Sequence, residues 1–244
     1  MKKGQVNQTL VIMPTYNERS NIVRSIEQLF KFNPEVQLLV VDDNSPDGTA
    51  ELVLEAIGRF KNRLFLLQRP NKAGLGPAYL AGFNWAFERG YWRVVEMDAD
   101  GSHRAEDLPR LLEETEFDLV IGSRWIPGGK VINWPIARKI VSQTGNLYAR
   151  LLLKTDIRDM TAGFRVYKVD LLKRLPLERI ASQGYSFQVE MTFRSIAMGA
   201  SAKEVAITFV EREHGVSKMN TAIVLEALRL VTRWGVARLL GKNI

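Results

Sequence analysis

The sequence predicts an α/β domain built on a mixed, mostly parallel sheet. From residue 9 to residue 123, short apolar runs alternate with segments in which apolar residues recur at helical spacing. This alternation is typical of parallel strands connected by helices. No internal repeat or low-complexity linker interrupts the pattern. The chain of 244 residues is long enough to bury a substantial core, so we expect a single domain followed by a helical tail.

Five strands and two helices are predicted in this first part of the chain. The strands span residues 9–13, 36–41, 64–67, 92–97 and 118–121. Apolar residues on one face indicate a first helix through Ile22, Val23, Ile26, Leu29 and Phe30. The second helical face contains Leu52, Val53, Ala56, Ile57 and Phe60.

The second half of the chain is predicted to complete the sheet. A helix follows Pro135 and ends near residue 154, a short strand-like run covers residues 164–167, a helix lies near residues 187–198, and a strand covers residues 205–210. Residues 221–240 are strongly helical, with Glu226, Arg229 and Arg233 forming a narrow polar stripe. Trp234, Arg238 and Lys242 would suit the headgroup boundary of an anionic membrane. The alternative is a helix packed on the domain or on another subunit.

Four of the first five strands end in polar loops. These loops are residues 14–18, 42–48, 98–103 and 122–124. In open α/β sheets, ligands bind beyond the carboxyl ends of the strands. We therefore expect all four loops to line one crevice.

Two carboxylates in Asp-x-Asp spacing end the fourth strand. Asp98 and Asp100 directly follow an apolar run. Mg²⁺ and Mn²⁺ prefer oxygen ligands, and Mg²⁺ usually takes one or two carboxylates together with water and substrate phosphates. The pair therefore suits a cation that arrives with a diphosphate, although the same spacing also occurs in solvated loops.

Composition limits the partners of the chain. The 34 Lys and Arg residues outnumber the 27 Asp and Glu residues, which gives a formal charge of +7 and favours anionic partners such as nucleotides or lipid phosphates. No motif supports nucleic-acid binding. The absence of cysteine excludes disulfides and thiolate metal sites. The first ten residues are too polar for a signal peptide, and the longest uncharged stretch, residues 73–87, is too short to span a bilayer.

Six short motifs occur in an order that is found in a known enzyme family. They are PTYNE, VVDDNSPDG, MDADGSH, GSRW, GFRVYK and HGVSKM. Together they resemble family 2 glycosyltransferases of the GT-A (Rossmann-like) fold, and among these the dolichol- or polyprenol-phosphate mannose synthases. The resemblance covers residues 9–219. It implies a GT-A domain over residues 1–219, with residues 220–244 as a C-terminal amphipathic helix that contacts a membrane or a subunit.

The resemblance implies an inverting transfer of mannose from GDP-mannose to a polyprenyl or dolichyl monophosphate, with Mg²⁺ or Mn²⁺ as cofactor. It assigns the metal to Asp98 and Asp100, and catalysis to Asp98, Asp100 and Arg124. It assigns the donor to Pro14, Tyr16, Glu18, Val41, Asp43, Asp98, Ala99, Asp100, Arg124, Arg212 and Lys218. The acceptor phosphate is assigned to Arg138 and Ser142.

Side-chain chemistry is compatible with these roles but leaves alternatives. A tyrosine ring packs on a base, and a carboxylate accepts hydrogen bonds from ring nitrogens or ribose hydroxyls. Cations stabilise a departing diphosphate without a proton transfer. Arg212 and Lys218 flank residues 214–217, a glycine-containing loop that could close over the donor. The purely structural interpretation of the first loop is a turn in which Asn17 or Ser20 caps the following helix. Asp42 is interpreted as structural, bonding backbone amides.

Further residues in and near these motifs have predicted roles. Some relatives have a metal-binding Gln where Ser102 stands, and serine is a shorter and weaker ligand. His103 is interpreted as making a loop-stabilising hydrogen bond rather than as catalytic. Gln188 or Glu190 could bond mannose hydroxyls, and Thr161 is the best candidate for a donor contact in its segment.

A missing motif favours a phosphate acceptor. Family 2 enzymes that glycosylate sugar hydroxyls usually need a carboxylate base, often followed by Gln-x-x-Arg-Trp, and this motif does not occur here. A lipid monophosphate is already anionic and attacks without a dedicated base. The missing motif therefore favours a phosphate acceptor. The resemblance further implies a cytoplasmic enzyme that lies peripherally on the cytoplasmic face of a membrane, anchored directly or through small membrane-protein partners.

Three rival functions compete with this prediction. The first is transfer of glucose or N-acetylhexosamine from another nucleotide sugar to the same kind of lipid. The second, a nucleotide-binding regulator without turnover, is disfavoured by the intact carboxylate pair. The third, a dinucleotide oxidoreductase, fails because position 79 is Tyr where the Gly-x-Gly-x-x-Gly pattern begun by Gly74 requires glycine.

Overall fold

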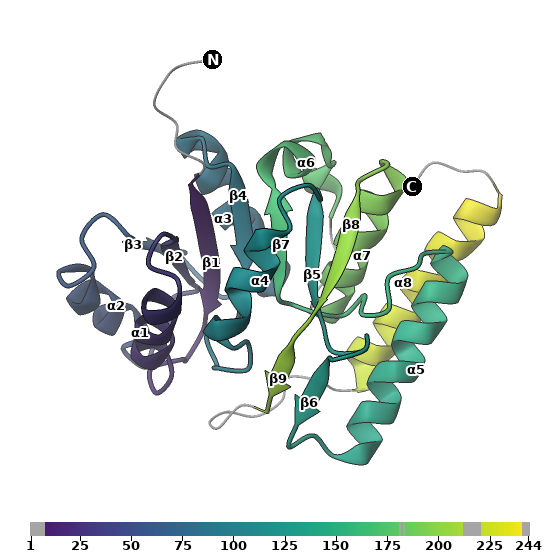
Figure 1. The fold of residues 1–244 in the computed structure, drawn as a ribbon, viewed down its shortest axis with the longest axis horizontal. Helices are drawn as coiled ribbons and strands as arrows, with labels where there is room; N and C mark the ends of the chain where they lie inside the picture. Colours follow the sequence, from purple (N-terminus) through teal and green to yellow (C-terminus); the bar gives the residue numbers. More distant parts are fainter. Residues whose placement is uncertain (1–7, 181, 183, 212–220, 241–244) are drawn as a thin grey trace.

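The computed structural model describes residues 8–240 apart from residues 181, 183 and 212–220. A seven-stranded sheet forms its centre, and helices cover both faces of this sheet (Figure 1). The strands are β1 (Thr9–Thr15), β2 (Gln37–Asp42), β3 (Leu64–Gln68), β4 (Arg93–Glu96), β5 (Leu119–Ser123), β6 (Lys130–Ile132), β7 (Arg165–Lys168), β8 (Ala202–Ala206) and β9 (Thr208–Val210). The α-helices are α1 (Ile22–Phe32), α2 (Thr49–Ile57), α3 (Leu75–Arg89), α4 (Leu108–Glu113), α5 (Ile136–Leu153), α6 (Val169–Arg174), α7 (Tyr185–Ala197) and α8 (Thr221–Leu239), with 3₁₀ turns at Ala105–Asp107 and Leu177–Arg179.

The central sheet is mixed and mostly parallel, as predicted. Its order is β3-β2-β1-β4-β7-β5-β8. Strands β3, β2, β1 and β4 run parallel to one another, and β8 runs parallel to β5. Strand β7 is antiparallel to both of its neighbours, β4 and β5. This inserted strand separates the carboxyl end of β5 from those of β2, β1 and β4.

The core lies on both faces of the sheet because side chains alternate along each strand. Leu10 and Ile12 of β1 belong to the cluster under α3, α5, α7 and α8, whereas Val11 and Met13 belong to the cluster under α1, α2 and α4. Helix α3 packs directly on β1 at Gly82, where a Cβ atom would lie 2.6 Å from Ile12 Cγ2. A glycine is therefore required at this helix–strand contact.

The prediction of a single strand over residues 205–210 is wrong, because two strands share this segment. The chain forms β8 on β5, then turns at Ile207 and forms β9 on β6 in a separate two-stranded sheet. The backbone N–H of Ile207 donates to Ser123 O at 3.0 Å, and Ile207 O accepts from Lys130 N at 2.9 Å. The Thr208 N–H donates to the Asp107 carboxylate at 2.9 Å. The apolar run is continuous in sequence, but the hydrogen bonds of Ile207 with Ser123 and Lys130 divide it between two sheets.

The other predicted elements are present, with ends displaced by a few residues. The five early strands, both early helices, the helix after Pro135, the strand near residue 165 and the helix near residue 190 correspond to β1 to β5, α1, α2, α5, β7 and α7. Helices α3, α4 and α6 and strand β6 were not predicted individually. In α3 the apolar face is interrupted by Gly76, Pro77 and Gly82, which weakens its helical period.

The C-terminal helix α8 packs on the domain. It contacts α5 and α7, and Figure 1 shows it alongside α5. Trp234 is only 5% exposed, and its ring stacks on Phe193 with centroids 5.9 Å apart. The prediction that Trp234 lies at a headgroup boundary is therefore wrong, and the alternative of packing on the domain is confirmed. Lys242 lies outside the described residues. None of the helices in the described part of the chain has the length and apolar content needed to cross a bilayer.

Candidate active site

The loops after β1, β2 and β4 meet at one edge of the sheet and line a cleft of about 410 Å³. They come together because these three parallel strands are neighbours. The predicted donor residues that line this cleft are Pro14, Tyr16, Glu18, Asp43, Asp98, Ala99 and Asp100. The lining also includes Lys72, Gly74 and Leu75 before and at the start of α3, and Gly184 and Tyr185 at the start of α7.

The first loop is fixed by the loop after β2. The Glu18 N–H donates to Thr49 Oγ1 at 3.0 Å, and the Glu18 carboxylate accepts from Asn21 Nδ2 at 2.9 Å. Helix α1 begins after Asn21 without a side-chain cap, so the capping interpretation of Asn17 or Ser20 is wrong. The Lys72 ammonium lies 4.1 Å from the centre of the Tyr16 ring. A flat aromatic face and a cation therefore meet inside the cleft.

The two aspartates at the carboxyl end of β2, Asp42 and Asp43, make different contacts. Asp42 is buried and accepts hydrogen bonds from the Ser45 N–H at 2.9 Å and from the Thr15 hydroxyl at 2.8 Å, which confirms its structural role. Asp43 lines the cleft, pairs with Arg69 at 2.7 Å and accepts from the Ala73 N–H at 3.1 Å. It thereby holds the segment that carries Lys72. Val41 is fully buried beneath this edge and does not line the cleft.

The Asp-x-Asp pair provides the oxygen ligands expected for a divalent cation. Asp98 and Asp100 both line the cleft, and the Asp98 side chain is 36% exposed. One Asp100 oxygen accepts from the Ser102 N–H at 3.0 Å. Ser102 itself is buried, and within the described residues no group of three or more His, Cys, Asp or Glu side chains is placed to hold a metal. Two carboxylates fit Mg²⁺ or Mn²⁺ if substrate phosphates complete the coordination.

His103 supports the backbone of this pair. Its Nδ1 accepts from the Asp98 N–H at 3.0 Å, so the neutral ring carries its proton on Nε2. Burial lowers the pKa of His103, and the ring stacks on Phe164 at 5.0 Å. Gly163 lies so close that a Cβ atom there would be 3.2 Å from His103 Cε1. The predicted loop-stabilising hydrogen bond is confirmed.

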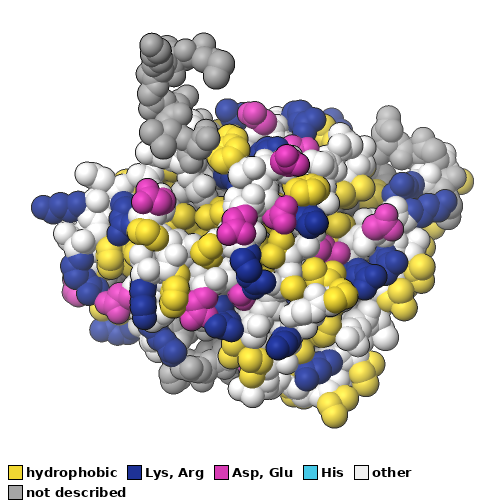
Figure 2. Space-filling view, viewed as in Figure 1, with side chains coloured by type: hydrophobic (Ala, Val, Ile, Leu, Met, Phe, Trp, Pro, Cys, Tyr) yellow, Lys and Arg dark blue, Asp and Glu magenta, His cyan; other side chains and the backbone are white. Residues whose placement is uncertain are grey.

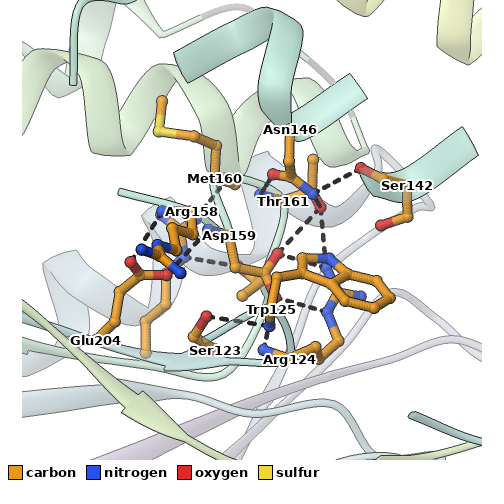
Figure 3. Close-up of polar contacts among 12 residues, drawn as sticks. Ser123, Arg124, Trp125, Ser142, Asn146, Arg158, Asp159, Met160, Thr161 and Glu204 are labelled. Carbon is orange, nitrogen blue, oxygen red and sulfur yellow. Dashed lines mark hydrogen bonds and ion pairs between the residues drawn. The ribbon is translucent and has the colours of Figure 1, made fainter. Parts of the chain in front are cut away.

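The fourth loop is not part of the lining of this cleft, but Arg124 lies close enough to the lining residues Asp98 and Tyr185 for their charges to interact. Arg124 is buried and forms a two-point contact with Asp159, through Nε at 2.8 Å and Nη2 at 2.7 Å (Figure 3). The Arg124 backbone N–H also donates to Asp159 at 2.9 Å. Burial alone would lower the pKa of the Arg124 guanidinium, but the Asp159 carboxylate reverses this and raises it. The cause of the displacement is β7, which places β5 one strand further from β4.

The Asp159 segment connects α5, β5 and β8. Thr161 Oγ1 accepts from Arg124 Nη2 at 2.9 Å and from Asn146 Nδ2 of α5 at 3.1 Å (Figure 3). Glu204 of β8 accepts from the Asp159 N–H at 2.9 Å. Thr161, predicted as a donor contact, is thus engaged inside this network.

The predicted acceptor residues lie on α5, away from the cleft lining. Arg138 forms an ion pair with Glu211, and its guanidinium lies 4.0 Å from the centre of the Trp134 ring. Ser142 follows one turn later, and its main-chain oxygen accepts from Asn146 at 2.9 Å (Figure 3). The structure therefore places Arg138 and Ser142 on the same helix, with the cation already neutralised by a carboxylate.

The residues predicted to contact the sugar, Gln188 and Glu190, are buried and are not part of the cleft lining. Glu190 is buried and bonded to Ser182 and Arg194. Gln188 is buried beside Glu96, a residue that was not predicted. Burial raises the pKa of Glu96 to about 8, against the opposing effects of Arg165 and of the Gln188 amide.

Some relevant residues could not be found from the sequence, and others lie outside the described residues. Lys72 meets Tyr16 across 56 positions of sequence, so no local pattern indicates the contact. Asp159 stands in the same segment as Thr161, the predicted donor contact, and its pairing with Arg124 follows from the sheet order. Arg212, Lys218 and residues 214–217 fall in the part of the chain that is not described.

The chain belongs to glycosyl transferase family 2, whose model matches residues 10–175. The polyprenol monophosphomannose synthase of Mycolicibacterium smegmatis is 50% identical over 230 residues, which cover 93% of this chain and 87% of that protein. The undecaprenyl-phosphate mannosyltransferase of Micrococcus luteus is 52% identical over 229 residues, which cover 93% and 94%.

Solved structures show the same GT-A-like fold. A glucosyl-3-phosphoglycerate synthase from Mycobacterium tuberculosis, in complex with Mn²⁺, uridine diphosphate and phosphoglyceric acid, matches with a TM-score of 0.64 and 19% identity. The match covers 96% of this chain and 78% of that one. A mannosyltransferase from Pyrobaculum calidifontis with GDP-Man and Mn²⁺ matches with a TM-score of 0.59 and 17% identity over 97% and 65% of the two chains.

Proposed function

We propose that the protein transfers mannose from GDP-mannose to a polyprenyl or dolichyl monophosphate, with inversion at the anomeric carbon. The observation that carries the proposal is the cleft in which Asp98 and Asp100 meet the loops after β1 and β2. Two relatives at 50% and 52% identity, whose names specify mannose transfer to a polyprenyl or undecaprenyl phosphate, support the choice of sugar and acceptor.

The cleft residues supply donor binding. Tyr16, Glu18 and Asp43 present a ring and two carboxylates to the nucleoside. Asp98 and Asp100 would hold Mg²⁺ or Mn²⁺, which when bound neutralises the developing charge of the diphosphate. The two solved structures described above, both with Mn²⁺, are compatible with this cofactor.

The acceptor needs no protein base in this scheme. An oxygen of the lipid monophosphate attacks the anomeric carbon of mannose while the bond from this carbon to the GDP oxygen breaks. The electron pair leaves with GDP, and the products are polyprenyl-phosphate mannose and GDP. Arg138 and Ser142 would bind the acceptor phosphate, which then competes with Glu211 for the Arg138 guanidinium. The protein would act peripherally at the cytoplasmic face of a membrane.

A donor-selection assay tests the proposal. Radiolabelled GDP-mannose, UDP-glucose and UDP-N-acetylglucosamine are each incubated with a short, water-soluble polyprenyl phosphate, with and without Mg²⁺ or Mn²⁺. We expect label in the lipid product from GDP-mannose only, and only with metal. Label from a UDP sugar alone would overturn the sugar assignment, and equal transfer in the presence of EDTA would overturn the role of the metal.

A further inference from the structure

Glu211 forms an ion pair with Arg138, the residue proposed to bind the acceptor phosphate. The side chains of Glu211 and Arg138 are 24% and 13% exposed, so the pair lies at the surface but is largely shielded from water. Within the described residues, the Glu211 carboxylate has no other hydrogen-bond partner. A carboxylate of the chain itself therefore occupies the guanidinium that the acceptor phosphate needs.

The neighbouring Arg124 is neutralised in a different way. Arg124 and Arg138 approach the same Trp134 ring, with their guanidinium carbons 5.3 and 4.0 Å from its centre. Asp159, the partner of Arg124, is fully buried and accepts from the backbone N–H of Arg124 as well as from its side chain. Glu211 is partly exposed and contacts only the side chain of Arg138. Of the two carboxylates, Glu211 is the one that a ligand can displace.

A short sheet brings Glu211 to Arg138. The Glu211 N–H donates to Ile132 O at 3.1 Å, which extends the pairing of β9 with β6. Strand β6 leads through Trp134 and Pro135 into α5, whose first turn carries Arg138. Because the backbone of Glu211 is held by this sheet, rotation of its side chain toward solvent separates the ion pair without moving either strand.

The surroundings of Arg138 contain hydrogen-bond donors that lack acceptors. Within the described part of the chain, Arg138 Nε, Trp134 Nε1 and Trp125 Nε1 are buried and have no hydrogen-bond partner. The rings of Trp125 and Trp134 lie 6.3 Å apart, so these donors belong to one cluster. Buried donors without an acceptor are rare and costly. A phosphate monoester brings three acceptor oxygens to this cluster, whereas the Glu211 carboxylate brings two.

The charges around Arg138 also favour an anion. Arg138 and Lys139 lie in the first turn of α5, which contains no Asp or Glu. Cations are unfavourable there because the N-terminus of a helix is the positive end of its dipole. In Figure 2 the lower right of the molecule, where β6 and α5 lie in Figure 1, is rich in Lys and Arg and poor in Asp and Glu. Glu211 is thus a local anion in positively charged surroundings.

We propose that Glu211 is an internal competitor of the acceptor phosphate: its carboxylate holds Arg138 until a phosphate monoester binds and displaces it. This inference rests on the proposed function, which assigns the acceptor phosphate to Arg138. Glu211 is a positioning residue that acts through Arg138. An internal competitor lowers the apparent affinity for every ligand of a site by the same factor, the fraction of molecules in which the site is open. Glu211 therefore weakens binding of the phosphodiester product as well and favours its release.

Acceptor binding without the sugar donor tests this role of Glu211. The probes are geranyl phosphate, a water-soluble phosphate monoester, and methyl geranyl phosphate, the corresponding diester with a single negative charge. Each is titrated into the protein by calorimetry. The variant Glu211→Gln keeps the size of the side chain and removes its charge. We expect its Kd for both probes to be about five-fold lower than that of the wild type, whose site is then open in roughly a fifth of the molecules.

The matched control is Glu106→Gln. Glu106 pairs with Arg104 rather than with Arg138, and it lines the same cavity of about 230 Å³ as Glu211. This control should bind both probes as the wild type does. GDP binding with Mn²⁺ should be unchanged in both variants, because neither glutamate lines the donor cleft. Unchanged GDP binding also shows that the variants are folded.

Three results would overturn the proposal. Equal affinities of Glu211→Gln and the wild type would show that the ion pair does not restrict the site. A larger gain for the monoester than for the diester would show that Glu211 acts only as a nearby charge, because such an effect grows with the charge of the ligand. An equal gain in Glu106→Gln would show that the effect comes from the net charge of the surface.

Mannose transfer to geranyl phosphate separates this inference from the proposed function. Glu211→Gln should lower the KM for this acceptor by about five-fold without raising kcat, because it changes binding of the acceptor and not the transfer step. If no form of the protein transfers mannose but Glu211→Gln binds both probes more tightly, the proposed function fails and the competitor role stands. If transfer occurs and the variant binds both probes as the wild type does, the function stands and the competitor role fails.

Discussion

Asp98 and Asp159 illustrate two ways in which one protein uses the same side chain. The Asp98 side chain is 36% exposed in a cleft that can admit a ligand, whereas the Asp159 side chain is fully buried against Arg124. The difference follows from the sheet order, because β4 is the parallel neighbour of β1, which in turn pairs with β2, whereas Arg124 follows β5 beyond the inserted β7. The accessible carboxylate of Asp98 is available to a ligand, whereas the saturated carboxylate of Asp159 joins α5, β5 and β8 into a fixed support.

Replacing Asp98 by Asn should have the largest effect on catalysis. The change keeps the size of the side chain but removes a negative charge from the proposed metal site. We expect the initial rate of mannose transfer to fall by roughly 10²–10³-fold, the range seen when one electrostatic contact to a leaving or developing charge is lost. Thermal unfolding should be nearly unchanged because the side chain is partly exposed. A variant with full metal-dependent activity would remove Asp98 from the site.

Replacing Asp159 by Asn should mainly reduce the stability of the fold, whereas the Asp98 change mainly reduces the rate of transfer. The variant leaves the buried Arg124 charge without its carboxylate, and breaking a buried ion pair in this way costs about 3–5 kcal/mol of unfolding free energy. Urea unfolding measures the loss, and Asp156→Asn, at an exposed position of the same loop, provides the control. An unchanged urea midpoint would show that Asp159 does not support the fold, and the contrast with Asp98 would fail.

The same contrast explains what the sequence could and could not predict. The cleft was predictable because a parallel sheet brings consecutive loops together, and Tyr16, Asp43 and Asp98 follow consecutive parallel neighbours. Arg124 was placed in the crevice by the same rule, but the antiparallel insertion of β7 is not visible in a short apolar run.

Long-range partners set another limit on prediction from the sequence. Nothing near residue 207 indicates that the strand divides there, because the partners are Ser123 and Lys130. The tail was predicted to be a helix with a mostly apolar surface, but sequence alone could not tell that Trp234 faces Phe193.

The buried carboxyl group of Glu96 can be tested through the pH dependence of the unfolding free energy. Its folded-state pKa of about 8 lies above the ordinary value of 4.5, so the folded protein binds this proton more tightly than the unfolded chain does. The stability contribution is therefore complete below pH 4.5 and is lost as the pH rises through 8. In metal-free buffer, Glu96→Gln should show a smaller fall in unfolding free energy than the wild type across this range.

The matched control for Glu96 is Glu113→Gln, which changes an exposed glutamate. This control should retain the pH dependence of the wild type when both are unfolded by urea at several pH values. Identical pH dependence in Glu96→Gln and the wild type would show that the Glu96 carboxyl is already ionised in the folded protein.

The smallest expected effect concerns Tyr16, which lines the cleft after β1. Its ring faces Lys72 at 4.1 Å, and a nucleobase packed on the ring would gain about 0.5–1.5 kcal/mol. Tyr16→Ala should therefore weaken GDP binding by roughly two- to ten-fold in calorimetry with Mn²⁺ present, whereas Tyr16→Phe should bind as the wild type does. If Tyr16→Phe loses as much affinity as Tyr16→Ala, the hydroxyl rather than the ring is responsible. If neither changes, the base does not pack on Tyr16, and ligand binding in the cleft depends on its carboxylates alone.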